Sequence, residues 1–426
     1  HVKVLAKSPF DVPKTDLFEA DIELNDTLLD KCYSCRHEPI PAHLLEETEQ
    51  LINNMLRADI LCEMDQYSPI LNSIMVSRKR PTTTNQRPGL RLLLDGRLLN
   101  AATLKLNSSI TPLNAVFAHL NNSKYLSVFD CTSAFFSIGV RKDKIPLLSF
   151  MFRNRRLALN RLPQGYKSST YWLEKLLNKA LENVDGSLNY ADDIMLTSTA
   201  GEGEEHHLEM LDRLLANCDR LNIRLNSHKT RLLVSDAVIV GFRFCNGRFE
   251  IPTARAESIQ NHPLPTTPRR LVSFTCFCRY FAMMVIRFAQ VTLPLHRLAQ
   301  EYKDKRRLVW NDEALKSFAD LKEAMANAIS IAPIMIGEPI KMSSDASNFA
   351  LAGLCWQIDP NTKEIRYLGT ASRILDKREI RWSTIRKEAA SVLLMLHVFD
   401  WFLKGAPLIT SYCDALSLIW LRNCKN

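Results

Sequence analysis

The sequence predicts an α+β protein that folds as more than one domain. Short strand-like runs alternate with stretches of helical periodicity between residues 42 and 251. A cluster of prolines between residues 252 and 268 then interrupts both patterns. A second unit, with the order strand, strand, strand, helix, strand, opens at Ile340. A chain of 426 residues is also too long for one compact core.

The composition is that of a soluble globular protein. Hydrophobic residues make up 46% of the chain and charged residues 24%. No apolar run approaches the ~20 residues of a membrane span, and the N-terminus has no signal-peptide layout, so no membrane partner is expected. The net charge of +9 fits either a solubilising surface or attraction to a polyanion such as nucleic acid. The first residue is His1 rather than Met, which indicates a piece of a longer chain.

Cysteine usage favours a reducing compartment. The eleven cysteines form no dense framework, and most lie in apolar stretches, so we expect buried thiols rather than disulfides. Cys32, Cys35 and His37 invite a zinc interpretation. A structural zinc site needs four ligands, however, and no second pair follows at a suitable spacing.

The N-terminal half begins with an extension that shows few periodic signals. A helix is predicted from Ala42 to Leu61, because apolar residues recur there at helical spacing. Two strand-like runs follow, Ile70–Val76 and Leu90–Leu94, and they flank a basic, turn-rich segment. That segment resembles a hairpin held over phosphates, although a solvated surface loop is the commoner case.

Strands and helices continue to residue 251 and beyond. The predicted strands are Tyr125–Asp130, Leu147–Phe152, Arg156–Asn160, Arg231–Val234, Val238–Cys245 and Arg248–Ile251. The predicted helices are Ser168–Asn183, Glu204–Leu221, Arg269–Gln290 and Asp312–Ile329. Asn246–Gly247 predicts a hairpin turn. His206 and His207 are predicted to lie on a solvated helix face.

Three acids stand where a sheet can present them to one side. Asp130 ends an apolar run, and Asp192 and Asp193 form the tip of an apolar hairpin, Leu188–Leu196. An Asp-Asp pair is usually a solvated turn, but inside an apolar β pattern it is costly without a purpose. Converging carboxylates repel one another unless cations lie among them, and oxygen ligands favour Mg²⁺ or Mn²⁺. Two such ions can activate a hydroxyl and stabilise a leaving phosphate.

Several segments, in this order along the chain, resemble the motifs of reverse transcriptases. They are Arg91–Asn100 (RLLLDGRLLN), Val128–Phe136 (VFDCTSAFF), Leu162–Gly165 (LPQG), Tyr190–Asp193 (YADD), Asn226–Lys229 (NSHK) and Ile239–Phe242 (IVGF). The resemblance continues into the thumb-to-connection region and the RNase H domain of gypsy-type LTR retrotransposons. The segments concerned are Leu308–Trp310, Ala314–Lys322, Ser344–Ser347, Trp382–Thr384 and Lys387–Glu388. Gln164, Phe136 and Ser137 are instead retrovirus-like, so the clade within retrovirus-like Pol polyproteins stays open.

The resemblance implies a right-hand polymerase with fingers, palm and thumb, followed by a connection and a truncated RNase H-like α/β domain. The implied domains are an N-terminal extension (1–41), fingers and palm (42–250), thumb and connection (251–335) and a partial RNase H-like domain (336–426). The implied activity is RNA-directed DNA polymerase, with RNase H cleavage of RNA in RNA–DNA hybrids.

Site residues are implied in the same way. The implied polymerase metal ligands are the catalytic acids Asp130, Asp192 and Asp193, together with the backbone carbonyl of Cys131. The nucleotide pocket would use Lys79 and Arg91 for the triphosphate, with Ala134, Phe135 and Gln164 around the sugar and base. Phe135 would reject a ribose 2′-hydroxyl because its ring leaves no volume for the extra oxygen. The implied RNase H acids and metal ligands are Asp345, Glu388 and Asp414, with a fourth acid expected beyond Asn426 and Phe349 standing where a small residue is usual.

The implied partners are an RNA template, a DNA primer, RNA–DNA hybrid and deoxynucleoside triphosphates, with Mg²⁺ as cofactor and Mn²⁺ as an alternative. Monomer and dimer both stay open, and the expected location is the cytoplasm, within a virus-like particle. Arg153, Arg155, Arg156 and Arg161 are candidates for template contact. Two rival functions remain: an RNA-templated RNA polymerase, and a decayed or domesticated element that binds nucleic acid without catalysis.

Overall fold

The computed structural model describes residues 2–25, 40–65, 68, 70–78, 89–109, 111–120 and 123–414. These residues divide into two compact units, and each unit is described by itself. Unit 1 comprises residues 1–119 and 124–234, and unit 2 comprises residues 120–123 and 235–426. The zinc interpretation of Cys32, Cys35 and His37, and the proposed triphosphate contact of Lys79, lie outside the described residues.

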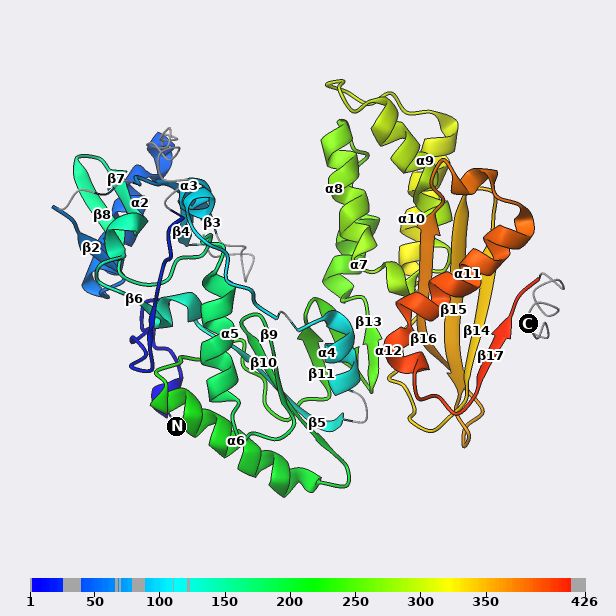
Figure 1. Ribbon diagram of the computed structural model, residues 1–426, viewed down its shortest axis with the longest axis horizontal. Coiled ribbons are helices and arrows are strands. Elements are labelled where there is room, and N and C mark those ends of the chain that lie inside the picture. Colours follow the sequence, from blue (N-terminus) through cyan, green and yellow to red (C-terminus); the bar gives the residue numbers. More distant parts are fainter. Residues whose placement is uncertain are drawn as a thin grey trace. The chain divides into compact units, whose positions relative to one another are not determined.

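Unit 1 combines short sheets with two long helices (Figure 1). Its strands are β1 (Glu19–Ala20), β2 (Leu61–Glu63), β3 (Ser73–Arg78), β4 (Leu90–Asp95), β5 (Ser123–Asp130), β6 (Gly139–Val140), β7 (Ser149–Phe152), β8 (Arg155–Leu159), β9 (Ser187–Tyr190) and β10 (Asp193–Thr199). Its α-helices are α2 (Leu45–Arg57), α3 (Arg97–Ala102), α4 (Leu113–His119), α5 (Ser169–Ala180) and α6 (Gly203–Arg220). Its 3₁₀ turns are η1 (Val2–Val4), η2 (Ala42–Leu44), η3 (Ala134–Ser137) and η4 (Ile145–Leu148).

The sheet β5-β10-β9 is central to the core of unit 1. Phe129 of β5 and Ile194 of β10 are fully buried, and they belong to the same apolar cluster as Leu177 of α5 and Leu214 of α6. Both helices carry their apolar residues at helical spacing, so one face of each is buried in this cluster. The sheet edge that bears the acids is therefore held by a packed core rather than by loops.

Unit 2 contains a three-stranded sheet, a set of helices and a four-stranded mixed sheet. Its strands are β11 (Asp236–Ile239), β12 (Phe242–Cys245), β13 (Arg248–Glu250), β14 (Ile340–Ala346), β15 (Ala350–Ile358), β16 (Ile365–Ile374) and β17 (Ile409–Tyr412). Its helices are α7 (Thr253–Gln260), α8 (Pro268–Arg279), α9 (Phe288–Glu301), α10 (Asp312–Ala326), α11 (Thr384–Val398) and α12 (Asp400–Leu403), with 3₁₀ turns η5 (Ala282–Met284) and η6 (Glu379–Arg381). The large sheet has the order β16-β15-β14-β17, with β17 parallel to β14. The predicted order of strands and helix after Ile340 is confirmed.

Three predicted elements are wrong, each for a local reason. Residues 238–245 do not form one strand, because Val240 and Gly241 have φ of +48° and +78° and turn the chain between β11 and β12. Segment 231–234 is no strand, although Arg231 forms a single backbone bridge with Val128. The helix predicted over 269–290 ends at Arg279, and α9 begins only at Phe288. The Asn246–Gly247 hairpin between β12 and β13 is confirmed.

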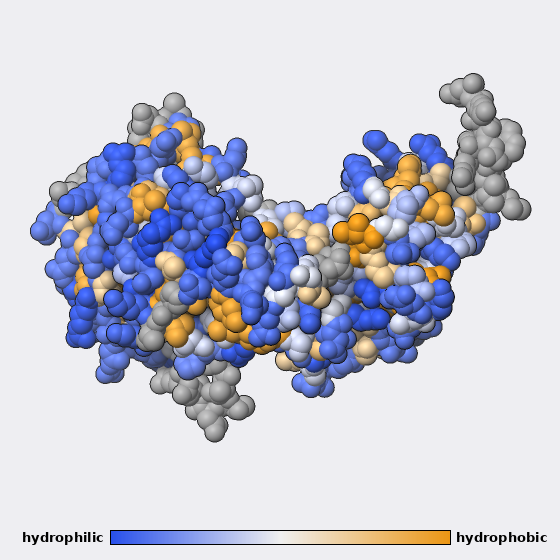
Figure 2. All heavy atoms as spheres, turned by 90° about the horizontal axis from the view of Figure 1, so that it is seen from below, coloured by the Kyte–Doolittle hydropathy of each residue, from blue (hydrophilic) through white to orange (hydrophobic). Residues whose placement is uncertain are grey.

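Two observations concern the helices and the surface. Among the described residues, no helix is both long enough and apolar enough to cross a membrane. On the face shown in Figure 2, hydrophilic residues cover most of unit 1, on the left, with apolar residues scattered among them.

His207 corrects the prediction of a solvated histidine pair. Its side chain is fully buried on α6, and its ring nitrogens lie 2.9 Å from the hydroxyl of Ser127 on β5 and 3.0 Å from that of Ser198 on β10. His206 beside it is partly exposed. One imidazole thus ties the helix to both acid-bearing strands, because each ring nitrogen has a hydroxyl partner.

We expect His207→Ala to lower the free energy of unfolding by about 1–3 kcal/mol, because it removes the imidazole partner of the buried Ser198 hydroxyl and leaves the Ser127 hydroxyl with only the backbone N–H of Leu233. Burial lowers the pKa of His207 below its ordinary value of 6.5, so the unfolded chain takes up a proton more readily than the folded one. The contribution of His207 is therefore complete above about pH 6.5 and decreases as the pH falls below it. Urea titrations from pH 5 to 8 measure this, with His206→Ala as the control. Equal loss in both variants would contradict the role of His207.

Candidate active sites

The first site is the edge of the sheet β5-β10-β9. Asp130 is the last residue of β5, and Asp193 is the first of β10. Asp193 pairs with Tyr190 of β9, so Ala191 and Asp192 form a two-residue turn, with Ala191 at φ +54°. The backbone N–H of Cys131 donates to the carbonyl of Asp192 at 3.3 Å. The structure thus brings together the three acids that the sequence predicted.

Electrostatic repulsion within this group is visible in Asp193. Burial, together with the neighbouring carboxylates of Asp192 and Asp130, raises the pKa of its carboxyl from 3.8 to about 6. Lys229 opposes this shift, and its ammonium lies 2.7 Å from Oδ1 of Asp130. A cation at this edge therefore stabilises the ionised acids.

A cavity of about 430 Å³ opens beside the acids. Asp130, Asp192 and the Cys131 residue line it, together with four of the predicted nucleotide-pocket residues: Arg91, Ala134, Phe135 and Gln164. Phe135 is half-buried in η3, and Arg91 is exposed on β4. The predicted nucleotide-pocket residues that the structure describes thus all line one cavity.

The turn that carries Gln164 is held by Asn100. The Asn100 side-chain amide donates to the carbonyl of Gly165 at 2.8 Å, and its oxygen accepts from the backbone N–H of Lys167 at 2.7 Å. Gly165 has φ +106°, and a Cβ there would lie 2.8 Å from the carbonyl oxygen of Leu94. Only glycine fits this close approach. The motifs Arg91–Asn100 and Leu162–Gly165 therefore contact each other at Gly165.

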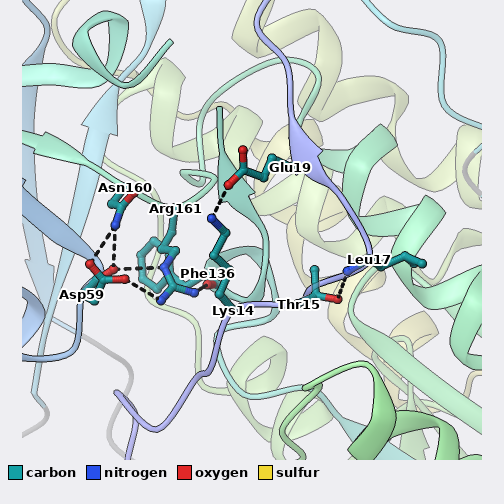
Figure 3. Close-up of polar contacts among 8 residues, drawn as sticks. All are labelled: Lys14, Thr15, Leu17, Glu19, Asp59, Phe136, Asn160 and Arg161. Atoms are coloured by element: carbon teal, nitrogen blue, oxygen red, sulfur yellow. Dashed lines mark hydrogen bonds and ion pairs between the residues drawn. The ribbon is translucent and has the colours of Figure 1, made fainter. Parts of the chain in front are cut away.

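Arg161 corrects the prediction of a template contact. Its guanidinium is buried and donates to the carbonyl oxygen of Asp59 at 3.0 Å, the carboxylate of Asp59 at 3.1 Å and the carbonyl of Phe136 at 3.3 Å (Figure 3). Asn160 also donates to Asp59, at 2.8 Å. Arg161 therefore fixes the backbone next to Phe135 instead of reaching solvent. The template contacts of Arg153, Arg155 and Arg156 stay predictions.

The second site lies in unit 2, at the centre of the four-stranded sheet. Asp345 is on β14, which runs parallel to β17. Ser343 of β14 lies opposite Tyr412 of β17. Asp345 and Asp414 each follow two residues after this pair, so they lie side by side. Glu388 of α11 is buried, and burial raises the pKa of its carboxyl, with Asp345 and Asp414 adding to the effect. The three predicted RNase H acids therefore lie close together.

Two features characterise this second site. The guanidinium of Arg287, the residue before α9, lies 2.8 Å from the carboxylate of Asp345. Glu388 Oε2 is buried without a hydrogen-bond partner among the described residues. An unpaired buried carboxylate oxygen is costly, and a bound cation would relieve this cost.

The donor sets of both sites fit divalent cations in chemistry. All their side-chain donors are carboxylate oxygens, which Mg²⁺ and Mn²⁺ prefer as ligands. Asp130 and Asp345 each form an ion pair with a basic side chain, Lys229 and Arg287. As the described side chains stand, however, no three His, Cys, Asp or Glu residues converge on one metal position. Side-chain rotation would have to accompany metal binding.

A sheet edge with three acids, beside a cavity lined by an arginine, an aromatic ring and a glutamine, defines a nucleotide polymerase of the palm type. The model of a family described as "Reverse transcriptase (RNA-dependent DNA polymerase)" matches residues 77–370. The model of an "RNase H-like domain found in reverse transcriptase" matches residues 336–426. The chain belongs to the reverse transcriptase family.

The relatives are polyproteins of mobile elements and retroviruses. The chain is 26% identical over 421 residues to the Pol polyprotein of the Drosophila melanogaster transposon opus, covering 96% of this chain and 41% of that polyprotein. It is 25% identical over 375 residues to the Gag-Pol polyprotein of woolly monkey sarcoma virus, covering 83% of this chain and 22% of the relative. The chain thus spans about two fifths or less of these two relatives.

Solved structures share the fold. A foamy viral protease–reverse transcriptase bound to double-stranded DNA superposes with a TM-score of 0.81 at 18% identity, covering 100% of this chain and 72% of that one. A foamy viral protease–reverse transcriptase bound to an RNA/DNA hybrid gives a TM-score of 0.83 at 18% identity, covering 99% and 54%. The predicted fold class, a right-hand polymerase with an RNase H-like domain, is confirmed.

Sequence reasoning missed two components of the first site. Lys229 was part of a matched motif, but nothing in its neighbours indicated an ion pair with an acid 99 residues away. Residues 6–10 of the N-terminal extension also line the cavity. The extension has no periodicity, so no local pattern could have placed it there.

We expect Asp193→Asn to stabilise the metal-free protein above pH 6, by up to about 3 kcal/mol, because it removes an ionised carboxylate from a buried site beside two other carboxylates. Folding raises the pKa of Asp193 from 3.8 to about 6, so the cost of its charge appears as the pH rises through this range. The stabilisation should vanish near pH 4. Urea unfolding in EDTA at pH 4 and pH 7.5 checks this. Asp320→Asn, at an exposed position of α10, is the matched control, and an equal effect of both changes would contradict the repulsion.

Proposed function

We propose that this chain copies RNA into DNA, and then DNA into DNA, by transferring a deoxynucleotidyl group from a triphosphate to the 3′-hydroxyl of a primer. One observation carries the proposal. Asp130 and Asp192 border a single cavity that Arg91, Phe135 and Gln164 also line. The cavity is thus lined by acids, by the cation Arg91, which suits phosphate, and by Phe135 and Gln164, which suit the sugar and base of a nucleotide.

The residues of the chain would divide the work. Arg91 presents a guanidinium suited to phosphate oxygens. The ring of Phe135 excludes a 2′-hydroxyl, which favours deoxynucleotides over ribonucleotides and speaks against an RNA-copying RNA polymerase. Gln164, fixed through Gly165 and Asn100, borders the nucleotide. Binding should be salt-dependent and largely indifferent to sequence, because base pairing selects the nucleotide.

Reverse transcriptases are generally dependent on divalent metal ions, and we propose Mg²⁺, with Mn²⁺ as a substitute, at Asp130, Asp192, Asp193 and the Cys131 carbonyl. The ions would supply activation of the 3′-hydroxyl and neutralisation of the leaving pyrophosphate. Lys229 would release Asp130 when they bind. The raised pKa of Asp193, caused by burial and by the carboxylates of Asp192 and Asp130, supports this assignment.

The second site would cleave RNA in RNA–DNA hybrids. Asp345, Glu388 and Asp414 come from a central strand, a covering helix and the end of the next strand, and side-chain rotation would bring their carboxylates to a second two-metal site. The unpaired Oε2 of Glu388 is the observation that supports metal binding there.

The proposed partners are an RNA template, a DNA primer, RNA–DNA hybrid and deoxynucleoside triphosphates. The foamy viral relatives in complex with double-stranded DNA and with RNA/DNA hybrid support the nucleic acids in this set. We propose that the chain acts without a membrane partner and as a monomer or a dimer. The proposed location is the cytoplasm, within a virus-like particle.

Primer extension tests the polymerase. With poly(rA), an oligo(dT) primer, dTTP and Mg²⁺, we expect extension by the parent. The double variant Asp192→Asn, Asp193→Asn should lose at least about 10³-fold in rate, because the metal-binding charge is gone. Asp320→Asn should match the parent. Failure of a folded parent to extend in either Mg²⁺ or Mn²⁺ would overturn the proposal in favour of nucleic-acid binding without catalysis.

Cleavage of a labelled RNA–DNA hybrid tests the second site independently. We expect Glu388→Gln to lose at least about 10²-fold in cleavage rate while primer extension is retained, because the two acid groups are separate. Glu301→Gln, at an exposed position of α9, is the control. Equal cleavage rates for Glu388→Gln and the parent would show that the Glu388 carboxylate has no catalytic role. A parent that extends primers without cutting would contradict the RNase H assignment alone.

A further inference from the structure

The N-terminal arm, residues 2–25, is an integral part of unit 1. Val4 is fully buried, its carbonyl accepts from the backbone N–H of Leu225 at 2.8 Å, and the N–H of Ala6 donates back to Leu225 at 2.9 Å. Further along, β1 pairs in parallel with β6. Figure 1 shows this dark-blue segment running along unit 1. The arm is thus fixed to the core at both ends.

The middle of the arm is anchored as well. Thr15 donates from its backbone N–H to the carbonyl of Ser137 at 2.7 Å, and Lys14 forms an ion pair with Glu19 (Figure 3). Gly139 has no side chain where Lys14 crosses it, and a Cβ there would lie 2.0 Å from Lys14 Cε. The fit of lysine over glycine sets the course of the arm.

Backbone bridges lead from the arm to the catalytic acids. Leu225, which pairs with the arm, also forms an antiparallel bridge with Cys131. Cys131 in turn donates to Asp192. The arm is therefore the outermost segment of a ladder that ends at the acids, and its position relative to them is fixed by hydrogen bonds.

Between these anchors the arm makes a tight turn at the cavity. The backbone N–H of Asp11 donates to the carbonyl of Ser8 at 3.1 Å, and that of Lys7 donates to the carboxylate of Asp11 at 2.8 Å. The hydroxyl of Ser133, one residue before η3, donates to the carbonyl of Pro9 at 3.3 Å. Residues 6–10 line the same cavity as the acids and the nucleotide-pocket residues.

Lys7 brings a charge that the cavity can use. Its side chain is exposed, and no carboxylate of the described residues lies within 4.0 Å of its ammonium. Lys229, by contrast, is paired with Asp130. Lys7 and Arg91 are therefore two cavity-lining cations that pair with no described carboxylate, and they come from distant segments. Such cations form charge-assisted hydrogen bonds with phosphate oxygens.

We propose that Lys7 is a nucleotide-binding residue: the N-terminal arm forms a wall of the nucleotide pocket, and the Lys7 ammonium binds the polyphosphate of the incoming deoxynucleoside triphosphate. This inference rests on the proposed polymerase function. The phosphate chemistry is shared with the backbone of a template or primer, so the experiment must separate the two sources.

The test is steady-state incorporation of dTTP on poly(rA)/oligo(dT), with KM and kcat measured separately. We expect Lys7→Ala to raise the KM for dTTP about tenfold, with the change mainly in KM, because one charged phosphate contact is lost. Lys7→Arg should restore most of the affinity, since the charge is kept. Lys3→Ala is the matched control: Lys3 is an exposed lysine of the same arm that does not line the cavity.

Binding of the primer–template, measured by fluorescence anisotropy over a range of salt concentrations, separates the sources. We expect the same Kd and the same salt slope for Lys7→Ala and the parent. A weaker Kd with a slope smaller by about one, and an unchanged KM for dTTP, would assign Lys7 to the nucleic-acid backbone and overturn the proposal. An unchanged KM, Kd and slope would also overturn it, leaving Lys7 a solvated side chain.

The outcomes also distinguish this inference from the proposed function. If the parent extends primers and Lys7→Ala matches it, the polymerase stands and the role of Lys7 falls. If the folded parent does not extend, both fall together. Thermal melts establish that Lys7→Ala is folded, as we expect for an exposed side chain.

Discussion

Repulsion among three carboxylates at one sheet edge is the constraint on which unit 1 depends. Asp130, Asp192 and Asp193 are held together by backbone pairing between β5, β10 and β9, not by attraction between their side chains. The core must supply the free energy that the charges cost. The buried faces of α5 and α6 do so by apolar packing, and His207 adds polar contacts to both strands.

The same arrangement recurs in unit 2 with different elements. A central strand and its parallel neighbour present Asp345 and Asp414, and a helix buries Glu388 beside them. In each unit a basic side chain lies on one acid, Lys229 on Asp130 and Arg287 on Asp345. In both clusters the basic side chain offsets part of the negative charge, and divalent ions would replace a lysine or arginine there at the cost of a side-chain movement.

The cavity of unit 1 is assembled from segments far apart in the sequence. Arg91 comes from a hairpin strand, Phe135 from a 3₁₀ turn, Gln164 from a glycine turn and Lys7 from the N-terminal arm. Three of these segments are held by hydrogen bonds to other segments of unit 1. Asn100 holds the glycine turn, Arg161 holds the backbone beside Phe135, and Ser133 holds the arm. Preorganisation of this kind lets exposed residues keep a set position for a ligand.

The acids and the order of the strands and helices around them could be predicted from local patterns: apolar runs that end on Asp, the Asn246–Gly247 turn, and the spacing of apolar residues on α5 and α6. The family resemblance came from short motifs such as Tyr190–Asp193 and Leu162–Gly165. The folded structure was needed to show that His207 is buried, that Arg161 is enclosed, that Lys229 lies on Asp130 and that the arm lines the cavity. The physical reason is that burial and ion pairing depend on neighbours distant in the chain, whereas periodicity reports only which face of an element is apolar.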